Sequence, residues 1–312
     1  MEKSFCIIPL QPNPENPDVE ELRSTYIANC VFNSFLSYTA IMLNIITNHV
    51  IRKTSSLPKT LKTLLLSLAV SDVGVGLLGQ PFYTALVVEW LQQNNPGCNT
   101  NIVFIFIVNT FSLASFFIVV AISVERFLAI HFHLRYQELV THTRVVVVVV
   151  SIWVLSGLLP AAVFWIPQDI FLLIKTFLGV IGVLLTTVAY IRIYLAVRHH
   201  KNQIQALQVQ QVAENGEMAN FISLVKSAVG IFYVYLVFLI CYFPFVISLV
   251  ALNINGTSIN LKRFLLYSWT VMFLNSSLNP VIYCWKMRHI RHAIINILRN
   301  MSWFRNRASL VS

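Results

Sequence analysis

Seven stretches of apolar sequence, each long enough to cross a lipid bilayer as a helix, constrain this chain more than any other feature. They cover residues 24–50, 63–88, 101–124, 145–168, 170–191, 227–252 and 264–285. A hydrocarbon core about 30 Å thick takes about 20 residues of helix, and five of the seven stretches contain no Asp, Glu, Lys or Arg. A backbone in lipid must satisfy its own hydrogen bonds, and ten-residue alternating strands are absent. The sequence therefore predicts an all-α membrane protein, a bundle of seven transmembrane helices.

The overall composition agrees with a membrane protein and excludes most soluble folds. Of the 312 residues, 57% are hydrophobic and only 11% are charged, whereas a soluble domain carries about 25% charged residues. The excess of apolar side chains must face lipid. Five cysteines are too few and too scattered for a disulfide scaffold. The net charge of +10 would suggest nucleic acid for a soluble protein, but here it bears on orientation, and no nucleic-acid partner is expected.

Lys and Arg residues are concentrated on one side of the predicted bundle. If the first span starts outside, 17 of the 22 fall in the inner loops and tail. The positive-inside rule then predicts an extracellular N-terminus at 1–23, a membrane domain at 24–285 and a cytoplasmic tail at 286–312, in a multi-pass protein of the plasma membrane. Apolar and basic residues of the tail recur at helical spacing, which predicts a short amphipathic helix on the inner leaflet. Asn255 lies in a glycosylation sequon on the outer side, a weak signal that agrees with this orientation.

The connections between the spans are mostly short. The outer link between the fourth and fifth spans is little more than residues 166–169. The inner link at 192–226 is longer and Gln-rich, and we expect it to extend the fifth and sixth helices into the cytoplasm.

Short motifs follow the seven spans in order. They are Asn44 in the first span, Leu68-Ala69-Val70-Ser71-Asp72 in the second, Glu125-Arg126-Phe127 at the end of the third, Trp153 in the fourth, Tyr190 in the fifth, Phe238 and Cys241-Tyr242-Phe243-Pro244 in the sixth, and Asn279-Pro280-Val281-Ile282-Tyr283 in the seventh. Each string alone is weak, but their joint order is specific and extends over the whole chain. The chain thus resembles the rhodopsin-like (class A) G-protein-coupled receptors. The resemblance implies a cell-surface receptor that passes the binding of an extracellular ligand to a heterotrimeric G protein, with arrestin and membrane lipids as further partners.

Asp72 needs partners, because a carboxylate at the membrane centre costs about 2.5 to 3.5 kcal/mol. The resemblance implies a small sodium pocket lined by Asp72, Ser115, Asn275, Ser276 and Asn279. Hard oxygen ligands of this kind suit a cation such as Na⁺. The alternative is a neutral Asp72 that is hydrogen-bonded to the same groups without an ion. We favour the ion site, because each polar partner that the family uses is present at its matching position.

The inner end of the third span carries the residues that the resemblance assigns to G-protein coupling. Glu125 is expected to hold the Arg126 guanidinium in the resting state and to free it for a partner that inserts from the cytoplasm. Phe127 completes the triplet. Leu134 matches the apolar residue of the second inner loop that docks into the G protein, although His133 stands where the family usually has proline. If Glu125 and Arg126 are instead ordinary interfacial charges, the rest of the motif pattern is unexplained.

Pro244 predicts a hinge in the sixth helix, because proline removes a backbone hydrogen bond and kinks the helix. Phe238 and Tyr242 lie just before it in the sequence. The family usually has tryptophan where this chain has Tyr242, and the smaller ring with its hydroxyl could alter basal activity.

Pro280 similarly loosens the seventh helix. The resemblance implies that Tyr283 and Tyr190 then approach each other through water when the inner face opens. Either tyrosine could otherwise be an interfacial anchor.

Two departures from the family pattern point to one branch. The second outer loop has no cysteine, so the usual bridge to the third helix cannot form; Cys6 and Cys98 could pair, and two free thiols are a comparable alternative. The fifth helix lacks its usual proline and has Gly182 near that point. Both departures, with the very short second outer loop, are shared with melanocortin receptors. We expect kinship with that branch or with the neighbouring adenosine-receptor branch, although the acidic residues with which melanocortin receptors bind basic peptides are not evident.

A mostly apolar, outward-opening cavity is expected for the ligand. Its lining should comprise Asn109, Ser112, Lys175, Tyr242, Phe245, Leu249, Trp269 and Phe273. Val108 stands where amine receptors place an aspartate, which argues against protonated amines, and Phe273 stands where opsins carry the retinal lysine, so no retinal is expected. Lys175 could pair with an anionic ligand, but it could equally extend to the membrane interface or meet Asp169, and we favour these two alternatives slightly. The cavity suits a lipid, a small aromatic molecule or a short peptide.

Other functional classes fit the sequence less well. A secondary transporter is the main alternative, but it predicts internal repeats and several buried charges. An ion channel would need a pore or filter motif, and none is visible. No enzyme is expected, because the spans contain no nucleophile with a base and no metal-binding cluster.

Overall fold

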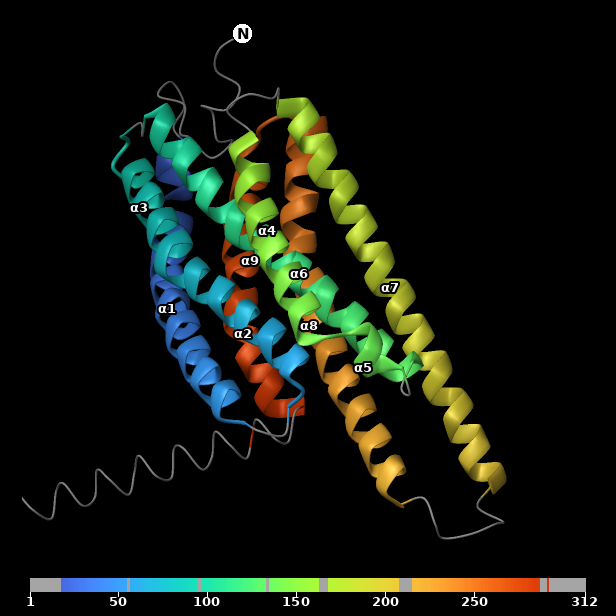
Figure 1. Cartoon of the computed structure of the whole chain (residues 1–312). Coiled ribbons are helices and arrows are strands. Elements are labelled where there is room, and N and C mark those ends of the chain that lie inside the picture. Colours follow the sequence, from blue (N-terminus) through green and yellow to red (C-terminus); the bar gives the residue numbers. More distant parts are fainter. Residues whose placement is uncertain are drawn as a thin grey trace, which may run out of the picture.

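The computed structural model describes residues 18–54, 57–94, 97–132, 135–162, 168–207, 215–286 and Arg291. All regular elements in these ranges are helices (Figure 1). Their bounds are α1 Asp18–Lys53, α2 Lys59–Gly74, η2 Val75–Gly79, α3 Gln80–Leu91, α4 Cys98–His131, α5 Tyr136–Leu139, α6 His142–Ala161, α7 Gln168–Leu207, α8 Asn215–Asn255 and α9 Ile259–Lys286. This confirms the predicted all-α bundle. The tail helix expected within 286–312 lies outside the described residues, apart from Lys286 and Arg291.

Each predicted span corresponds to one rod of the bundle. Helices α2, η2 and α3 follow one another without a break and together form the second span. Helices α7 and α8 extend well beyond the bundle at the end that carries Arg126, which is called the inner end below, as predicted for the long link between them (Figure 1). The predicted end of the fourth span at residue 168 is wrong, because α6 ends at Ala161. Pro160, which lacks a backbone N–H, lies in the last turn of α6.

Six of these rods are long and apolar enough to cross a membrane on length and composition alone, and α9 is the seventh rod of the bundle. The reason that α9 is less apolar is the polar face that it buries. Its buried polar residues include Ser268, Asn275, Ser276, Ser277 and Asn279. Helix α9 packs against α1 and α8, which shield this face from lipid.

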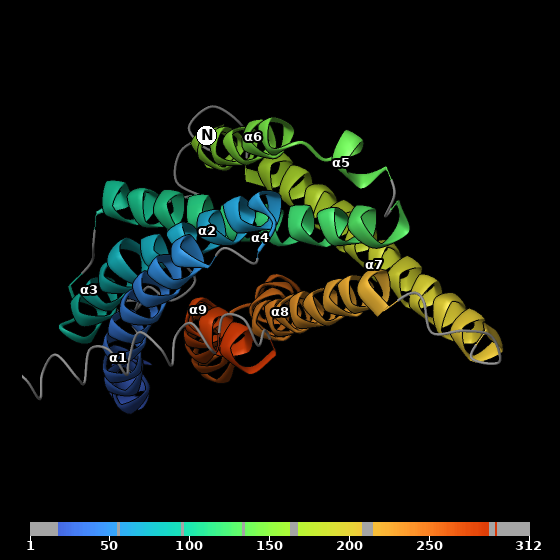
Figure 2. The same ribbon diagram turned by 60° about the horizontal axis from the view of Figure 1, so that its bottom comes forward.

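Helix α4 is the central helix of the bundle. It packs against α2, α6, α7 and α8, and Figure 2 shows it crossing the molecule between α2 and α7. Two apolar cores follow its length. The inner core includes Ile118 and Ile122, and the outer core includes Phe104 and Val108. The fold therefore connects both halves of the bundle through one helix.

The second span contains a one-turn π-helix that the sequence analysis did not foresee. Within η2, the backbone N–H of Gln80 donates to the carbonyl of Val75, five residues earlier. Pro81 follows directly and has no N–H to continue the α-helical ladder. Such a bulge rotates the helix beyond it and so changes which residues of α3 face the bundle.

Candidate functional site

Asp72 is fully buried and lies against the seventh span. The Asn279 side-chain nitrogen donates to Asp72 Oδ2 over 2.8 Å, and the Ser276 side chain is also hydrogen-bonded to this carboxylate. Ser115 is buried nearby but donates to Ser71 over 2.9 Å. The structure thus brings two of the predicted pocket residues into contact with Asp72.

Several buried oxygens of the predicted pocket residues have no hydrogen-bond partner within the described part of the chain. Among the described residues, Oδ1 of Asp72, of Asn275 and of Asn279 have no hydrogen-bond partner. All three residues are at most 2% exposed. Unpaired buried oxygens cost about 1 to 3 kcal/mol each, and these are hard ligands that suit Na⁺. The side chains present therefore fit a small cation.

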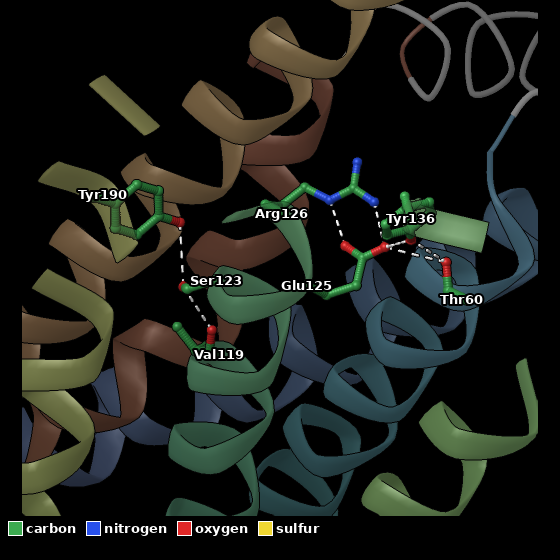
Figure 3. Close-up of polar contacts among 7 residues, drawn as sticks. All are labelled: Thr60, Val119, Ser123, Glu125, Arg126, Tyr136 and Tyr190. Atoms are coloured by element: carbon green, nitrogen blue, oxygen red, sulfur yellow. Dashed lines mark hydrogen bonds and ion pairs between the residues drawn. The ribbon is translucent and has the colours of Figure 1, made fainter. Parts of the chain in front are cut away.

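At the inner end of α4, Glu125 holds Arg126 through two bonds (Figure 3). Arg126 Nε lies 2.5 Å from Glu125 Oε2 and Nη2 lies 2.5 Å from Oε1. Both residues are buried, with exposures of 4% for Glu125 and 1% for Arg126. Leaving either partner alone in this setting would cost about 3 to 5 kcal/mol. The predicted resting pair is therefore formed in this conformation.

Two further side chains bind the same carboxylate, and the sequence analysis missed both. Tyr136, from the short helix α5, donates to Glu125 Oε1, and Thr60, from the first turn of α2, donates to the same oxygen over 3.1 Å (Figure 3). The hydroxyls of Thr60 and Tyr136 are 2.9 Å apart. Burial, together with the nearby Glu125 carboxylate, raises the pKa of Tyr136 to about 12. No motif marks Tyr136 in the sequence, because its role depends on how the loop folds back onto α2 and α4.

Tyr190 and Tyr283, which are expected to meet through water in the open state, are not hydrogen-bonded to each other here. Ser123 donates to the Tyr190 hydroxyl over 3.3 Å (Figure 3), and the Tyr190 ring stacks against Tyr235 at 5.9 Å. Tyr283 is 1% exposed, and its hydroxyl has no hydrogen-bond partner among the described residues. Phe127 and Tyr190 both pack against the buried cluster of Ile130, Ile193 and Ala228. Leu134, the predicted docking residue, lies outside the described residues.

Tyr242 connects the sixth helix to the third. Its ring stacks on Phe238 with the centroids 4.1 Å apart, and Phe238 contacts Phe116 of α4 at 5.5 Å. The Tyr242 hydroxyl is hydrogen-bonded to Ser112. Pro244 lies inside α8 two residues further on, and Pro280 lies inside α9. Both predicted hinge points are therefore within continuous helices in this conformation.

The outer half of the bundle, where the ligand cavity was expected, holds a cluster of aromatic rings. Trp269 packs between Phe245 at 4.6 Å and Phe273 at 5.7 Å. Tyr83 and Phe104, which the sequence analysis did not include, complete it at 5.8 Å and 5.4 Å from Trp269. The cluster joins α3, α4, α8 and α9. No motif in the sequence marks Tyr83 or Phe104, because their grouping with Trp269 depends on how α3 and α4 pack against α9.

The remaining predicted ligand residues are more scattered. The Asn109 side chain donates to the Ile105 carbonyl of its own helix over 2.8 Å. The Leu249 side chain is 36% exposed, unlike the aromatic rings of the cluster. The side chain of Lys175 lies outside the described part of the chain. The structure therefore groups Phe245, Trp269 and Phe273 and leaves the other contacts as predictions.

The cysteines divide into two groups. Cys98, at the start of α4, is disulfide-bonded, which fits the pairing considered from the sequence, although Cys6 lies outside the described residues. Cys30, Cys241 and Cys284 are free thiols within spans, as the sequence predicted. Asn255 is exposed at the end of α8, just before Gly256 at a φ of 71°.

Comparisons with known proteins agree with this geometry. The model of the family described as "7 transmembrane receptor (rhodopsin family)" matches residues 43–283. The chain is 25% identical over 297 residues to the adenosine receptor A2a of Equus caballus, covering 85% of this chain and 70% of that protein. It is also 25% identical over 267 residues to melanocortin receptor 4 of Danio rerio, covering 82% and 79%. Squid rhodopsin shares the fold with a TM-score of 0.79 at 17% identity, over 94% of this chain and 92% of that one.

Proposed function

Because this chain belongs to the rhodopsin family of seven-transmembrane receptors and is a cell-surface G-protein-coupled receptor, we propose that the Glu125–Arg126 pair is its switch. The supporting observation is the bidentate contact between the two side chains, buried at the inner end of α4. In the resting state Glu125 holds the Arg126 guanidinium, and Thr60 and Tyr136 hold the Glu125 carboxylate in place. A ligand that favours the open-inside state frees Arg126 for the G protein, and it can do so only through its higher affinity for that state.

The proposed orientation places residues 1–23 outside and the tail inside, so that Arg126 faces the cytoplasm. The basic inner loops support it through the positive-inside rule. An epitope tag at the N-terminus should be stained by antibody on intact cells, whereas a tag at the C-terminus should be stained only after permeabilisation.

The proposed ligand is not a protonated amine, and it is a lipid, a small aromatic molecule or a short peptide. Val108 is 5% exposed and offers no counter-charge to an amine. The rings of Phe245 and Trp269, which are only partly buried, offer stacking surfaces at the outer end of α8 and α9, and Phe273 packs behind Trp269. Phe273 also leaves no amine for a retinal Schiff base at this position. The chain's relatives are named as receptors for adenosine and for melanocortins, which belong to two of these ligand classes.

A sodium ion is the proposed occupant of the pocket around Asp72. The unpaired oxygens of Asp72, Asn275 and Asn279 would hold it, with Ser115 and Ser276 nearby. When bound, the ion would neutralise the buried carboxylate and favour the resting packing of α2 against α9.

Nucleotide exchange on purified G proteins tests the proposed switch. The receptor is reconstituted in lipid nanodiscs, and exchange is followed on a panel of G proteins with and without ligands from the three classes. Arg126→Ala should keep its expression at the surface and lose exchange. Glu125→Gln removes the charge that holds Arg126, so ligand-free exchange should rise. Full signalling by Arg126→Ala would falsify the proposed role.

A further inference from the structure

A groove between the first two spans lies on the outer surface of the bundle, away from the site described above. Its volume is about 340 Å³. Its lining residues are Ile45, Asn48, His49 and Arg52 from α1, and Val70 and Val73 from α2. We propose that this groove binds one anionic phospholipid of the inner leaflet, with the phosphate at His49 and Arg52 and an acyl chain along Ile45 and Val70.

The lining separates into an apolar and a basic end. On α1, the sequence spacing of Ile45, Asn48, His49 and Arg52 places them on one helical face. Arg52 lies in the last turn of α1, at the membrane interface, and Ile45 lies seven residues deeper, about 10 Å at 1.5 Å per residue. Val70 is 47% exposed and Ile45 is 52% exposed, within membrane-spanning segments. The groove therefore runs from the interface into the hydrocarbon region and faces lipid.

The polar groups at the interface end are available to a ligand. No hydrogen bond or ion pair of the Asn48, His49 or Arg52 side chain occurs among the described residues, and His49 and Arg52 are exposed. None of the six lining residues is acidic. Arginine matches the geometry of a phosphate with several donors, and Asn48 adds an amide donor beside it. This charge pattern favours an anionic headgroup over a neutral one.

A cation lies beside the end of α1 that carries Arg52. The C-terminal carbonyls of α1 would repel a phosphate, but Lys62 of α2 binds them, with its Nζ 2.5 Å from the Arg52 carbonyl oxygen and 3.5 Å from that of Thr54. The positive charge of Lys62 thus offsets the negative end of α1 next to Arg52. Anionic lipids are concentrated in the cytoplasmic leaflet, which the basic end of the groove faces in the proposed orientation.

Native mass spectrometry of the full chain in neutral detergent tests this inference. The probes are dioleoylphosphatidylserine, dioleoylphosphatidylcholine and soluble glycerophosphoserine. Wild-type protein should retain one phosphatidylserine in preference to phosphatidylcholine, and the soluble headgroup should not displace it. A charge that contacts the phosphate should contribute about 1 kcal/mol, so Arg52→Gln should weaken retention about fivefold, and a further His49→Gln should weaken it more. Arg52→Lys keeps the charge and should largely restore retention.

Two variants separate a specific site from general attraction to basic protein. Lys53→Gln removes the neighbouring charge, which does not line the groove, and should leave retention unchanged. Val70→Trp fills the groove and should abolish retention although every charge remains. Equal retention of phosphatidylcholine, or an equal loss in Lys53→Gln and Arg52→Gln, would overturn the inference. Lipid binding in detergent does not depend on membrane orientation or on signalling. This test can therefore fail while the proposed function holds, and it can succeed while the proposed function fails.

Discussion

At the scale of single residues, Glu125 is the point where the inner face is held together. Its carboxylate accepts hydrogen bonds from Arg126 of its own helix, from Thr60 of α2 and from Tyr136 of α5. The sequence predicted the pair with Arg126, because adjacent residues of a known motif need no tertiary information. It could not predict the contacts of Thr60 or Tyr136 with Glu125. Thr60 is 65 residues away from Glu125 in the sequence, and Tyr136 reaches the carboxylate only when the loop after α4 has folded back.

Tyr136 should contribute stability that changes with pH only in the alkaline range. The ordinary pKa of tyrosine is 10, and in the folded protein the pKa of Tyr136 is raised to about 12. The protonated hydroxyl is the form that donates to Glu125, so its contribution is fully present below about pH 10 and is lost as the pH rises towards 12. The apparent melting temperature of Tyr136→Phe should therefore lie below that of wild type by a constant amount from about pH 6 to 9. If the difference in apparent melting temperature between Tyr136→Phe and wild type changed between pH 6 and 9, the hydrogen bond from a protonated Tyr136 to Glu125 would not be its cause.

Asp72 should make the stability of the ligand-free receptor depend on sodium. An ion that binds only the folded state raises stability with its concentration. Replacing choline chloride with NaCl at constant ionic strength should therefore raise the apparent melting temperature of wild type. Asp72→Asn should abolish this increment, whatever it does to the baseline, because it removes the anionic ligand. If the mutant keeps the full increment, the pocket around Asp72 is not the sodium site.

At the scale of helices, the length of the apolar stretches was sufficient to predict seven rods, but the π-helix and the close contacts of the glycines were not predictable. The π-helix at Val75–Gly79 is followed by Pro81, and Gly74 and Gly76 are closely packed against neighbouring helices. A Cβ at Gly74 would lie 2.1 Å from the Phe111 ring. Hydrophobic periodicity carries no information on such contacts, because they depend on the partner helix.

Gly182 explains how the fifth helix approaches the third without the proline that the family usually has. A Cβ at this position would lie 2.5 Å from the ring of Phe116. Gly182→Ala should therefore force this ring to move and destabilise the protein by about 1 to 3 kcal/mol, the usual cost of overpacking. Thermal unfolding in detergent measures the effect.

Gly179, one turn earlier on α7, is the matched control. A Cβ there meets nothing within 4 Å, so Gly179→Ala should leave stability unchanged or raise it by up to about 1 kcal/mol through better helix propensity. Adding Phe116→Leu to Gly182→Ala should recover part of the loss. Equal destabilisation by the two alanines would show that contact with Phe116 is not the reason for the glycine.

At the scale of the whole molecule, α4 spans both halves of the bundle. Its outer part packs into the aromatic cluster around Trp269, and its inner part carries Arg126. Between them, Phe116 contacts Phe238 and, through it, Tyr242 of the hinged α8. The sequence predicted the seven rods from the length of the apolar stretches, and the family resemblance predicted the polar residues around Asp72. The sequence did not predict that rings from α3 and α4 fill the outer half, because this packing depends on helix rotation.

The central claim is that release of Arg126 accompanies outward movement of the inner end of α8 away from the rest of the bundle. Spin labels at Gln137 of α5 and Lys226 of α8, both exposed, report this distance by double electron–electron resonance, in a background without the free cysteines. Addition of a nucleotide-free G protein to the receptor in nanodiscs should shift the distribution to longer distances, and Arg126→Ala should prevent the shift. An unchanged distribution in a wild-type receptor that binds and activates the G protein would contradict the account.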